Sequence, residues 1–334
     1  MKAYVMPAGS KGPDDLRLVE RPDPKPGPGQ VLVRVRAASL NYRDQAAITG
    51  RYFMPVTRDT IPLSDGAGEV IAVGEGVLGL QVGDRVAGTF TQPDPHGPHN
   101  GPYAALGLPY DGMLAEQVVM HEIGAIKLPA GYSFEEGACM PCAGVTAWVC
   151  LFGAGRPVRP GQTVLVLGTG GVSIWALQLG VASGCRVIAT TSREDKAERL
   201  KALGALDVVN YKTHEAWDEE VMRLTGGRGA DCVVEVGGAG TLQRSMNALA
   251  HEGKIGLIGV LSQGSSNPHT LMAKHGHMHG IFVGPREQFE QLIAGVEAMR
   301  IKPVIDKVFP FDQARQAYLH QASGDFMGKV VIAV

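Results

Sequence analysis

The sequence predicts an α/β protein in which a β-rich region is joined to a doubly wound parallel sheet. Residues 1–127 consist of short apolar runs separated by glycine and proline, a pattern typical of strands and turns. Beyond about residue 128, strand-like runs alternate with helical patterns, as in parallel sheets. The 45 glycines and 21 prolines also favour a turn-rich region. We expect one domain over 1–127 and 285–334 and another over 128–284.

The first domain is expected to open with a strand at Met1–Val5. Prolines at every second position between Pro22 and Pro28 exclude a helix there. Val31–Ala37 alternates apolar residues with arginines, as a half-exposed strand does. Two further short strands, at 68–74 and 83–88, are bracketed by turn residues.

The second domain is expected to contain six parallel strands, each a short apolar run. After Pro285, the pattern predicts two helices that alternate with two strands. The expected strands of the sheet are Val164–Leu167, Arg186–Thr190, Asp207–Val209, Cys232–Val236, Lys254–Ile258 and Gly280–Val283, and the expected tail is helix Arg286–Met299, strand Val304–Phe309, helix Phe311–Gln321 and strand Lys329–Val334.

A glycine turn between the first two of these strands indicates a dinucleotide site. Strand, glycine turn, helix and strand follow one another within about thirty residues, as in the Rossmann βαβ unit. Gly168 permits the tight turn, and Gly170 lets backbone N–H groups approach a pyrophosphate at the helix N-terminus. The third glycine position holds Ser173, which is still small. The turn residues expected at the cofactor are Gly168, Thr169, Gly170, Gly171 and Val172.

The end of the second strand favours NADPH over NADH, although NADH stays possible. An NAD site places a carboxylate there to accept from the ribose hydroxyl. This chain has Thr191, Ser192 and Arg193 instead, with Lys196 one turn later. Hydroxyls and cations suit a 2′-phosphate, whereas the alternative is an ordinary solvated helix start.

Composition excludes several other functions. A net charge of −2 gives no sign of nucleic-acid binding. No apolar run is long enough to span a membrane, and the N-terminus does not read as a signal peptide. Five cysteines without a disulfide framework fit a reducing cytoplasm. We expect a cytoplasmic protein that binds small molecules.

Several blocks in a fixed order resemble the medium-chain dehydrogenase/reductase superfamily over the whole chain, and its zinc-free quinone-oxidoreductase branch most closely. The blocks are Ala37–Asp44, Asp65–Val70, Val82–Val86, Pro141–Ala147, the glycine turn and Gly328–Val331. The resemblance implies a GroES-like catalytic domain, a Rossmann domain and an active site in the cleft between them. It also places cofactor contacts at Lys196 and Tyr211, and further ones at Thr146, Val260, Phe282, Val283 and Lys329.

The positions that hold catalytic zinc in relatives argue against a metal here. Zinc needs three protein ligands, but this chain has Asn41 and Ser64 where the resemblance expects cysteine and histidine, and only Cys142 is in place. The segment expected to bind a structural zinc, 91–112, contains no cysteine. We therefore expect no zinc. Two weaker metal-like patterns are the Cys139–Cys142 pair and the row His275, His277 and His279, which an extended backbone would place on one face. His96 and His99 are expected in a loop rich in proline and glycine.

Without a metal, hydride addition to a quinone or an α,β-unsaturated carbonyl is the favoured chemistry, because the resulting anion needs only hydrogen-bond donors. Alternatives are a metal-independent alcohol dehydrogenase or carbonyl reductase, and a weakly catalytic NADPH-binding or sensing protein. The apolar last strand, Gly280–Val283, is an uncovered edge that predicts a homodimer. The candidate catalytic residues are Asn41, Tyr42, Tyr52, Ser64 and Asp65.

Overall fold

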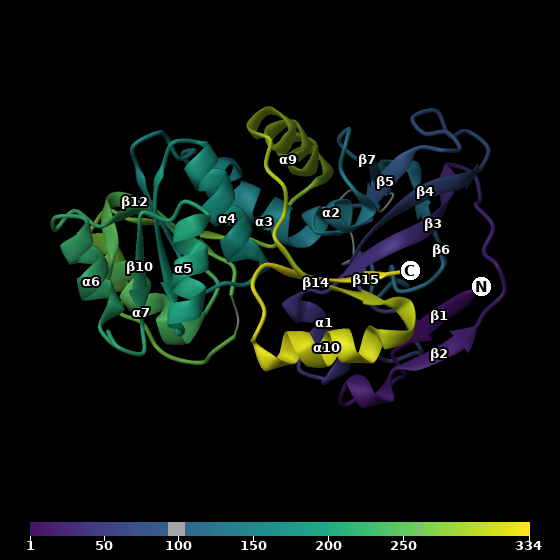
Figure 1. Ribbon diagram of the computed structural model, residues 1–334, viewed down its shortest axis with the longest axis horizontal. Coiled ribbons are helices and arrows are strands. Elements are labelled where there is room, and N and C mark those ends of the chain that lie inside the picture. Colours follow the sequence, from purple (N-terminus) through teal and green to yellow (C-terminus); the bar gives the residue numbers. More distant parts are fainter. Residues whose placement is uncertain (93–103, 260) are drawn as a thin grey trace. The chain divides into compact units, whose positions relative to one another are not determined.

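A computed structural model describes residues 1–92, 104–259 and 261–334 of the chain (Figure 1). The described residues divide into two compact units. The first consists of Met1–Ala143, Pro285–Glu297 and Lys302–Val334, and the second of Gly144–Gly284 and Ala298–Ile301.

The division differs from the sequence-based one at residues 128–143, which pack with the first unit rather than the second. Helix α2 (Phe134–Ala138) lies against strands β3, β4, β5 and β15 of the first unit. Just before it, the Tyr132 hydroxyl donates to the Val296 carbonyl at 3.2 Å. The apolar pattern of residues 128–143 does not show which sheet they pack against. The sequence therefore predicted them as the start of the second domain.

The first unit is built on a seven-stranded sheet in which β3 is central. Strand β3 pairs with β4, β6 and β15, all antiparallel, and β14 joins β15 in parallel. Its inward side chains form a core with β1 and α10. The strands of this sheet are β3 (Gln30–Ser39), β4 (Asp65–Val73), β5 (Arg85–Gly88), β6 (Gln117–His121), β7 (Ala125–Lys127), β14 (Ile305–Pro310) and β15 (Lys329–Ala333). A separate two-stranded sheet consists of β1 (Lys2–Val5) and β2 (Arg17–Glu20).

Helix α1 (Tyr42–Ile48) follows β3 directly and is almost wholly buried. The Asp44 carboxylate accepts from the backbone N–H of Asn41 at 2.7 Å, which satisfies one donor at the helix start. Most of α9 (Arg286–Met299) and all of α10 (Ala314–Ser323) also belong to the first unit. Single 3-10 turns lie at Pro13–Asp15, Glu122–Gly124 and Phe311–Gln313.

The second unit contains a six-stranded parallel sheet whose order is β10-β9-β8-β11-β12-β13. The chain starts in the middle with β8, winds outward to β10, then returns to β11 and winds the other way, which is the Rossmann order. This confirms the predicted fold class. The strands are β8 (Thr163–Val166), β9 (Arg186–Thr191), β10 (Asp207–Asn210), β11 (Ala230–Glu235), β12 (Leu249–Leu257) and β13 (His277–Gly280).

Helices flank this sheet and bury its apolar side chains (Figure 1). Helix α4 lies on β8 and β9, α5 on β9 and β10, and α7 on β11 and β12. The helices are α3 (Val145–Trp148), α4 (Gly171–Ala182), α5 (Glu194–Ala202), α6 (Trp217–Leu224), α7 (Ala239–Asn247) and α8 (Pro268–Ala273), with π-helical segments Met140–Gly144 and Val149–Gly153 on either side of α3.

The last strand of the sheet is His277–Gly280, so the predicted strand at Gly280–Val283 is wrong. Pairing with β12 places His277 opposite Lys254 and Gly280 opposite Leu257, after which the chain leaves the sheet. Val283 has a φ of 54°, outside the range of a strand. The edge strand is therefore polar and half-exposed, and the homodimer stays a prediction.

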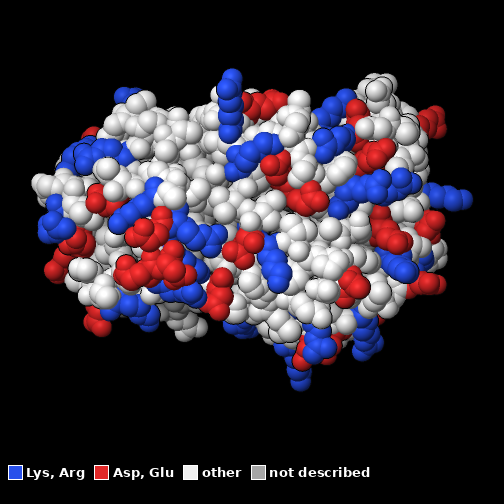
Figure 2. Space-filling model, in the orientation of Figure 1, with Lys and Arg blue, Asp and Glu red and all other residues white. Residues whose placement is uncertain are grey.

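Among the described residues, no helix combines the length and apolar character that crossing a bilayer requires. Figure 2 shows lysine and arginine interspersed with aspartate and glutamate on the face that it draws.

Candidate active site

The glycine turn of the second unit has the geometry of a phosphate cradle. Gly168 has a φ of 72°, a conformation that favours glycine. A Cβ at Gly168 or Gly170 would meet no atom within 4 Å, so the space beside the turn is open. No side chain caps α4 in the described part of the chain, which leaves first-turn N–H groups for a phosphate. These residues fit a dinucleotide pyrophosphate.

Two hydroxyls hold the turn in place. The Gly168 N–H donates to Thr190 Oγ1 at 3.1 Å, which ties the turn to the end of β9. The buried Ser173 hydroxyl donates to the Leu167 carbonyl at 2.7 Å. Ser173 thus occupies the third glycine position of the motif and donates a hydrogen bond to a carbonyl just after the strand. The sequence indicated Thr190 as a hydroxyl at the end of the second strand, but not its hydrogen bond to the glycine turn.

The residues predicted to read the ribose come together at the ends of β9 and β10. Thr191 lies opposite Asn210 in the sheet, and the Tyr211 N–H donates to the Thr191 carbonyl at 2.9 Å. Thr191 Oγ1 accepts from the Arg193 N–H at 3.3 Å, and Ser192 lies between them. The Lys196 side chain is buried within the first turn of α5.

The Arg193 guanidinium makes a contact that the sequence did not predict. Its Nε and Nη2 atoms each donate to the Asp195 carboxylate at 2.9 Å. This ion pair holds the pKa of Asp195 below its ordinary value, mainly through the hydrogen bond from Arg193. An anionic ligand at Arg193 would therefore compete with Asp195 for these two donors.

The other predicted cofactor residues lie apart from this cluster along the chain. Thr146 is buried in α3, Phe282 is 57% exposed, and Val283 is buried beside it. Lys329 lies in the first unit, at the start of β15. Val260 lies outside the described residues.

In the first unit, three of the five predicted catalytic residues form one buried hydrogen-bonded chain. Asn41 Nδ2 donates to Ser64 Oγ at 3.3 Å, and Ser64 Oγ donates to Asp65 Oδ1 at 2.8 Å. Asp65 Oδ2 accepts from the backbone N–H of Cys142 at 3.0 Å. The three side chains are buried, so their polar atoms satisfy one another.

The Lys329 ammonium is the cationic end of this hydrogen-bonded chain of side chains. The ammonium donates to Asn41 Oδ1 at 2.5 Å and to the Leu40 carbonyl at 2.7 Å. It lies 3.9 Å from Asp65 Oδ2, and both side chains are buried. Two opposite charges thus compensate each other across the pocket. The sequence placed Lys329 at the cofactor, not beside Asn41.

Burial perturbs the titratable groups around this chain. It raises the pKa of Asp44 to about 6, although Arg43 and the hydrogen bond from the Asn41 N–H act in the opposite direction. Burial, and after it the charge of Asp65, raises the pKa of the Cys142 thiol. The Cys142 thiol is therefore neutral at neutral pH.

The two predicted tyrosines are not part of this hydrogen-bonded cluster. Tyr42 is the first residue of α1 and is 45% exposed. The Tyr52 ring lies 5.2 Å from Arg43 Cζ and 4.4 Å from the Phe53 ring. Arg43, which the sequence did not single out, donates to the Leu106 and Leu108 carbonyls at 2.9 and 3.1 Å.

A second residue that sequence reasoning missed is Glu235, a fully buried carboxylate at the carboxyl end of β11. Its Oε1 atom accepts from the N–H groups of Gly237 and Gly238 at 2.7 and 2.9 Å and from the Thr241 hydroxyl at 2.6 Å. Its Oε2 atom accepts from the Ser245 hydroxyl. Glu235 thereby fixes the turn into α7, next to the strand that carries the glycine turn.

The weaker metal-like patterns form no site in the described residues, where no three histidine, cysteine or acidic side chains are grouped for a metal. The Cys139 thiol donates to the Glu135 carbonyl at 3.1 Å, and burial raises its pKa to about 12. His275 has a φ of 49°, so the expectation that all three histidines share one strand face is wrong. His96 and His99 lie outside the described residues.

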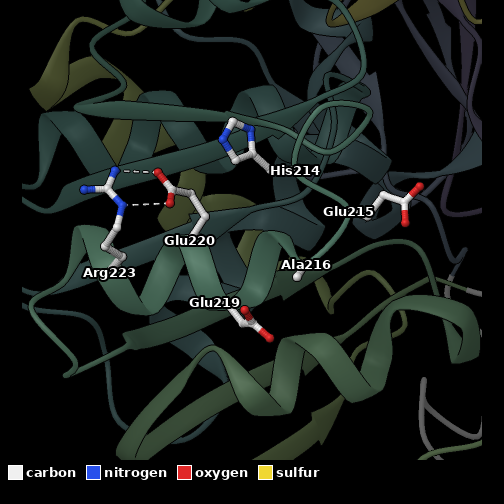
Figure 3. A pocket seen from close by; sticks show the side chains of 6 residues that line it. All are labelled: His214, Glu215, Ala216, Glu219, Glu220 and Arg223. Atoms are coloured by element: carbon white, nitrogen blue, oxygen red, sulfur yellow. Dashed lines mark hydrogen bonds and ion pairs between the residues drawn. The ribbon is translucent and has the colours of Figure 1, made fainter.

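A surface hollow at the start of α6 contains none of the predicted site residues (Figure 3). Glu220 and Arg223 face each other and form an ion pair at 2.5 Å, while Glu215 and Glu219 point away from that pair. We assign no function to this hollow, which is lined by His214, Glu215, Ala216, Glu219, Glu220 and Arg223.

Two protein families match the two halves of the chain. Residues 27–130 match the alcohol dehydrogenase GroES-like domain, and residues 171–298 match the zinc-binding dehydrogenase family. A zinc-type alcohol dehydrogenase-like protein of Schizosaccharomyces pombe is 41% identical, with 99% of each chain covered. The quinone oxidoreductase of Rattus norvegicus is 30% identical, with 96% of this chain and 94% of the relative covered.

Solved structures agree with these matches. An NAD-dependent alcohol dehydrogenase is 36% identical and superposes with a TM-score of 0.90, with both chains fully covered. A mycobacterial protein in complex with NADPH is 28% identical and has a TM-score of 0.82, again with full coverage of both. The chain therefore belongs to the medium-chain dehydrogenase/reductase superfamily and is an NAD(P)H-dependent oxidoreductase with a GroES-like and a Rossmann domain.

Proposed function

We propose that the protein is a zinc-free, NADPH-dependent reductase of quinones or activated alkenes. The observation that carries this proposal is the buried chain from Lys329 through Asn41 and Ser64 to Asp65. Two of its members, Asn41 and Ser64, stand at positions that the family resemblance assigns to zinc ligands. The similarity to a quinone oxidoreductase supports the same reaction class.

The donor set of this pocket does not fit a catalytic zinc. Asn41 Oδ1 already accepts from an ammonium, and Ser64 Oγ lies between an amide donor and a carboxylate acceptor. Neither an amide nor a serine hydroxyl is among the usual zinc ligands. The Lys329 ammonium would also repel a divalent cation that bound next to Asn41.

These residues suit a reaction in which negative charge develops on an acceptor oxygen. When bound, NADPH supplies a hydride, which is two electrons and one hydrogen nucleus. Addition of hydride to the β-carbon of an enone, or to a quinone, gives an enolate or a hydroquinone anion, and a proton from solvent completes the product. Asn41 Nδ2 is the donor that would stabilise the anion, because a preorganised amide in a buried site costs little reorganisation.

The reaction is tested by screening acceptors while NADPH absorbance and the metal content of the same preparation are measured. We expect quinones or enones to oxidise NADPH, no stoichiometric zinc, and full activity in the presence of a chelator. Ketones and simple alcohols with NADP⁺ serve as the comparison substrates. One zinc per chain together with loss of activity on chelation would contradict the proposal.

We also propose that Arg193 reads the 2′-phosphate of NADPH. Replacing Arg193 with alanine should weaken NADPH binding roughly 10- to 100-fold and leave NADH binding nearly unchanged, because only NADPH carries the phosphate. The matched control is Asp195→Asn, which releases the guanidinium from its ion pair and should tighten NADPH binding. Dissociation constants from fluorescence titration decide the matter, and equal losses for both cofactors in Arg193→Ala would exclude this role.

A further inference from the structure

The ammonium of Lys329 decides which way the Asn41 side-chain amide is oriented. Lys329 is buried and donates to Asn41 Oδ1 and to the Leu40 carbonyl. An ammonium has three donors and no acceptor. The amide atom that faces Lys329 must therefore be the carbonyl oxygen, and the NH₂ group must lie on the other side.

The opposite end of the chain imposes the same orientation. A carboxylate only accepts, so the Ser64 hydrogen points to Asp65 Oδ1, 2.8 Å away. The Ser64 oxygen is then left to accept from Asn41 Nδ2. A donor-only group at one end and an acceptor-only group at the other thus fix the direction of every hydrogen bond between them.

One hydrogen of the Asn41 amide makes no hydrogen bond with the described residues. The Nδ2 atom carries two hydrogens, and one of them goes to Ser64. Within residues 1–92, 104–259 and 261–334, no second acceptor lies within hydrogen-bond reach of Nδ2. The contact between Oδ1 and a cation also polarises the amide and makes its N–H groups stronger donors.

We propose that Lys329 is a positioning residue for the reduction, which acts by holding Asn41 as a polarised donor. This inference rests on the proposed function, in which Asn41 Nδ2 stabilises the oxyanion. Without the ammonium, only the 3.3 Å hydrogen bond to Ser64 Oγ still orients the amide, and its N–H groups lose the polarisation that the cation supplies.

The test is a double-mutant cycle between Lys329→Met and Asn41→Ala. Methionine fills a similar volume without the charge. If Lys329 acts through Asn41, Lys329→Met should lower kcat roughly 10- to 100-fold in the wild-type background. It should cause no further loss in the Asn41→Ala background, and the NADPH dissociation constant should be unchanged in both.

Two results would overturn the inference while the proposed function stands. One is a kcat loss in Lys329→Met that multiplies with that of Asn41→Ala. The other is weaker NADPH binding in both backgrounds, which would show that Lys329 binds the cofactor, as the family resemblance implies. If Asn41→Ala keeps full activity, the oxyanion role itself fails, and the inference fails with it.

Because Lys329→Met leaves the buried Asp65 carboxylate without its cation, the single variant can lose its fold. The variant Lys329→Met/Asp65→Asn removes both charges and is compared with Asp65→Asn alone. The inference requires a lower kcat in the double variant. Equal kcat values in these two proteins would contradict it.

Discussion

Replacement of Glu235 with leucine is expected to lower the free energy of unfolding of the second unit by about 3–5 kcal/mol. The carboxylate accepts from two backbone N–H groups and two hydroxyls at a fully buried site. Leucine fills the space but accepts nothing, so the Gly237 and Gly238 N–H groups lose their acceptor. Buried donors without an acceptor retain the full cost of their desolvation.

Tryptophan fluorescence measures this loss in the appropriate part of the molecule. All three tryptophans, Trp148, Trp175 and Trp217, belong to the second unit, so denaturant titration followed by their emission reports its unfolding. Glu235→Gln is the matched control, because its Oε1 atom can still accept from both glycines. We expect a smaller loss, about 1–3 kcal/mol, since the hydrogen bonds lose their charge. A Glu235→Leu protein as stable as the wild type would show that the carboxylate does not hold this turn.

Local patterns predicted the doubly wound sheet well, because each strand and helix there carries its own periodicity. The exception is the last strand. The apolar run Gly280–Val283 predicted a strand there, but the segment that pairs with the sheet is His277–Gly280. Strand pairing there is set by the register with β12, which no local pattern encodes. The boundary between the units differs from the predicted one for the same reason, because α2 packs against strands that lie far from it in the sequence.

The candidate site was predicted in part. The motifs identified Asn41, Ser64 and Asp65, because they occupy positions with a known role in the family that the chain resembles. The contact between Lys329 and Asn41 joins residues 288 positions apart, so only the folded sheet reveals it. Glu235 could have been predicted from its position, because an acidic residue at a strand end before two glycines can accept from their N–H groups. An analysis of apolar periodicity does not consider such a residue.

The ion pair between Arg193 and Asp195 changes how the cofactor preference is understood. A count of cations near β9 favours NADPH, yet the guanidinium already has an anionic partner. Because both side chains are substantially exposed, that pair contributes little to stability. A phosphate dianion can therefore displace the Asp195 carboxylate at small cost, which keeps the predicted preference compatible with the structure.

Replacement of Asn41 with alanine is expected to lower kcat on quinones or enones roughly 10²- to 10³-fold, the loss found when one oxyanion donor is removed. The alanine has no N–H to donate, and the Lys329 ammonium loses one of its two acceptors. The NADPH dissociation constant should stay near the wild-type value, because the proposed phosphate contacts belong to the second unit.

Three further variants separate the donor role of Asn41 from packing. Asn41→Asp keeps the size of the side chain but places a carboxylate where the donor is needed, so it should be at least as inactive as Asn41→Ala. Tyr42→Phe and Tyr52→Phe remove the hydroxyls of the two other candidate donors and leave the rings in place. A kcat loss in either tyrosine variant identifies a second donor, whereas an unchanged kcat identifies a packing residue. Full activity of Asn41→Ala with the best acceptor would exclude the oxyanion role, and another group would then have to stabilise the anion.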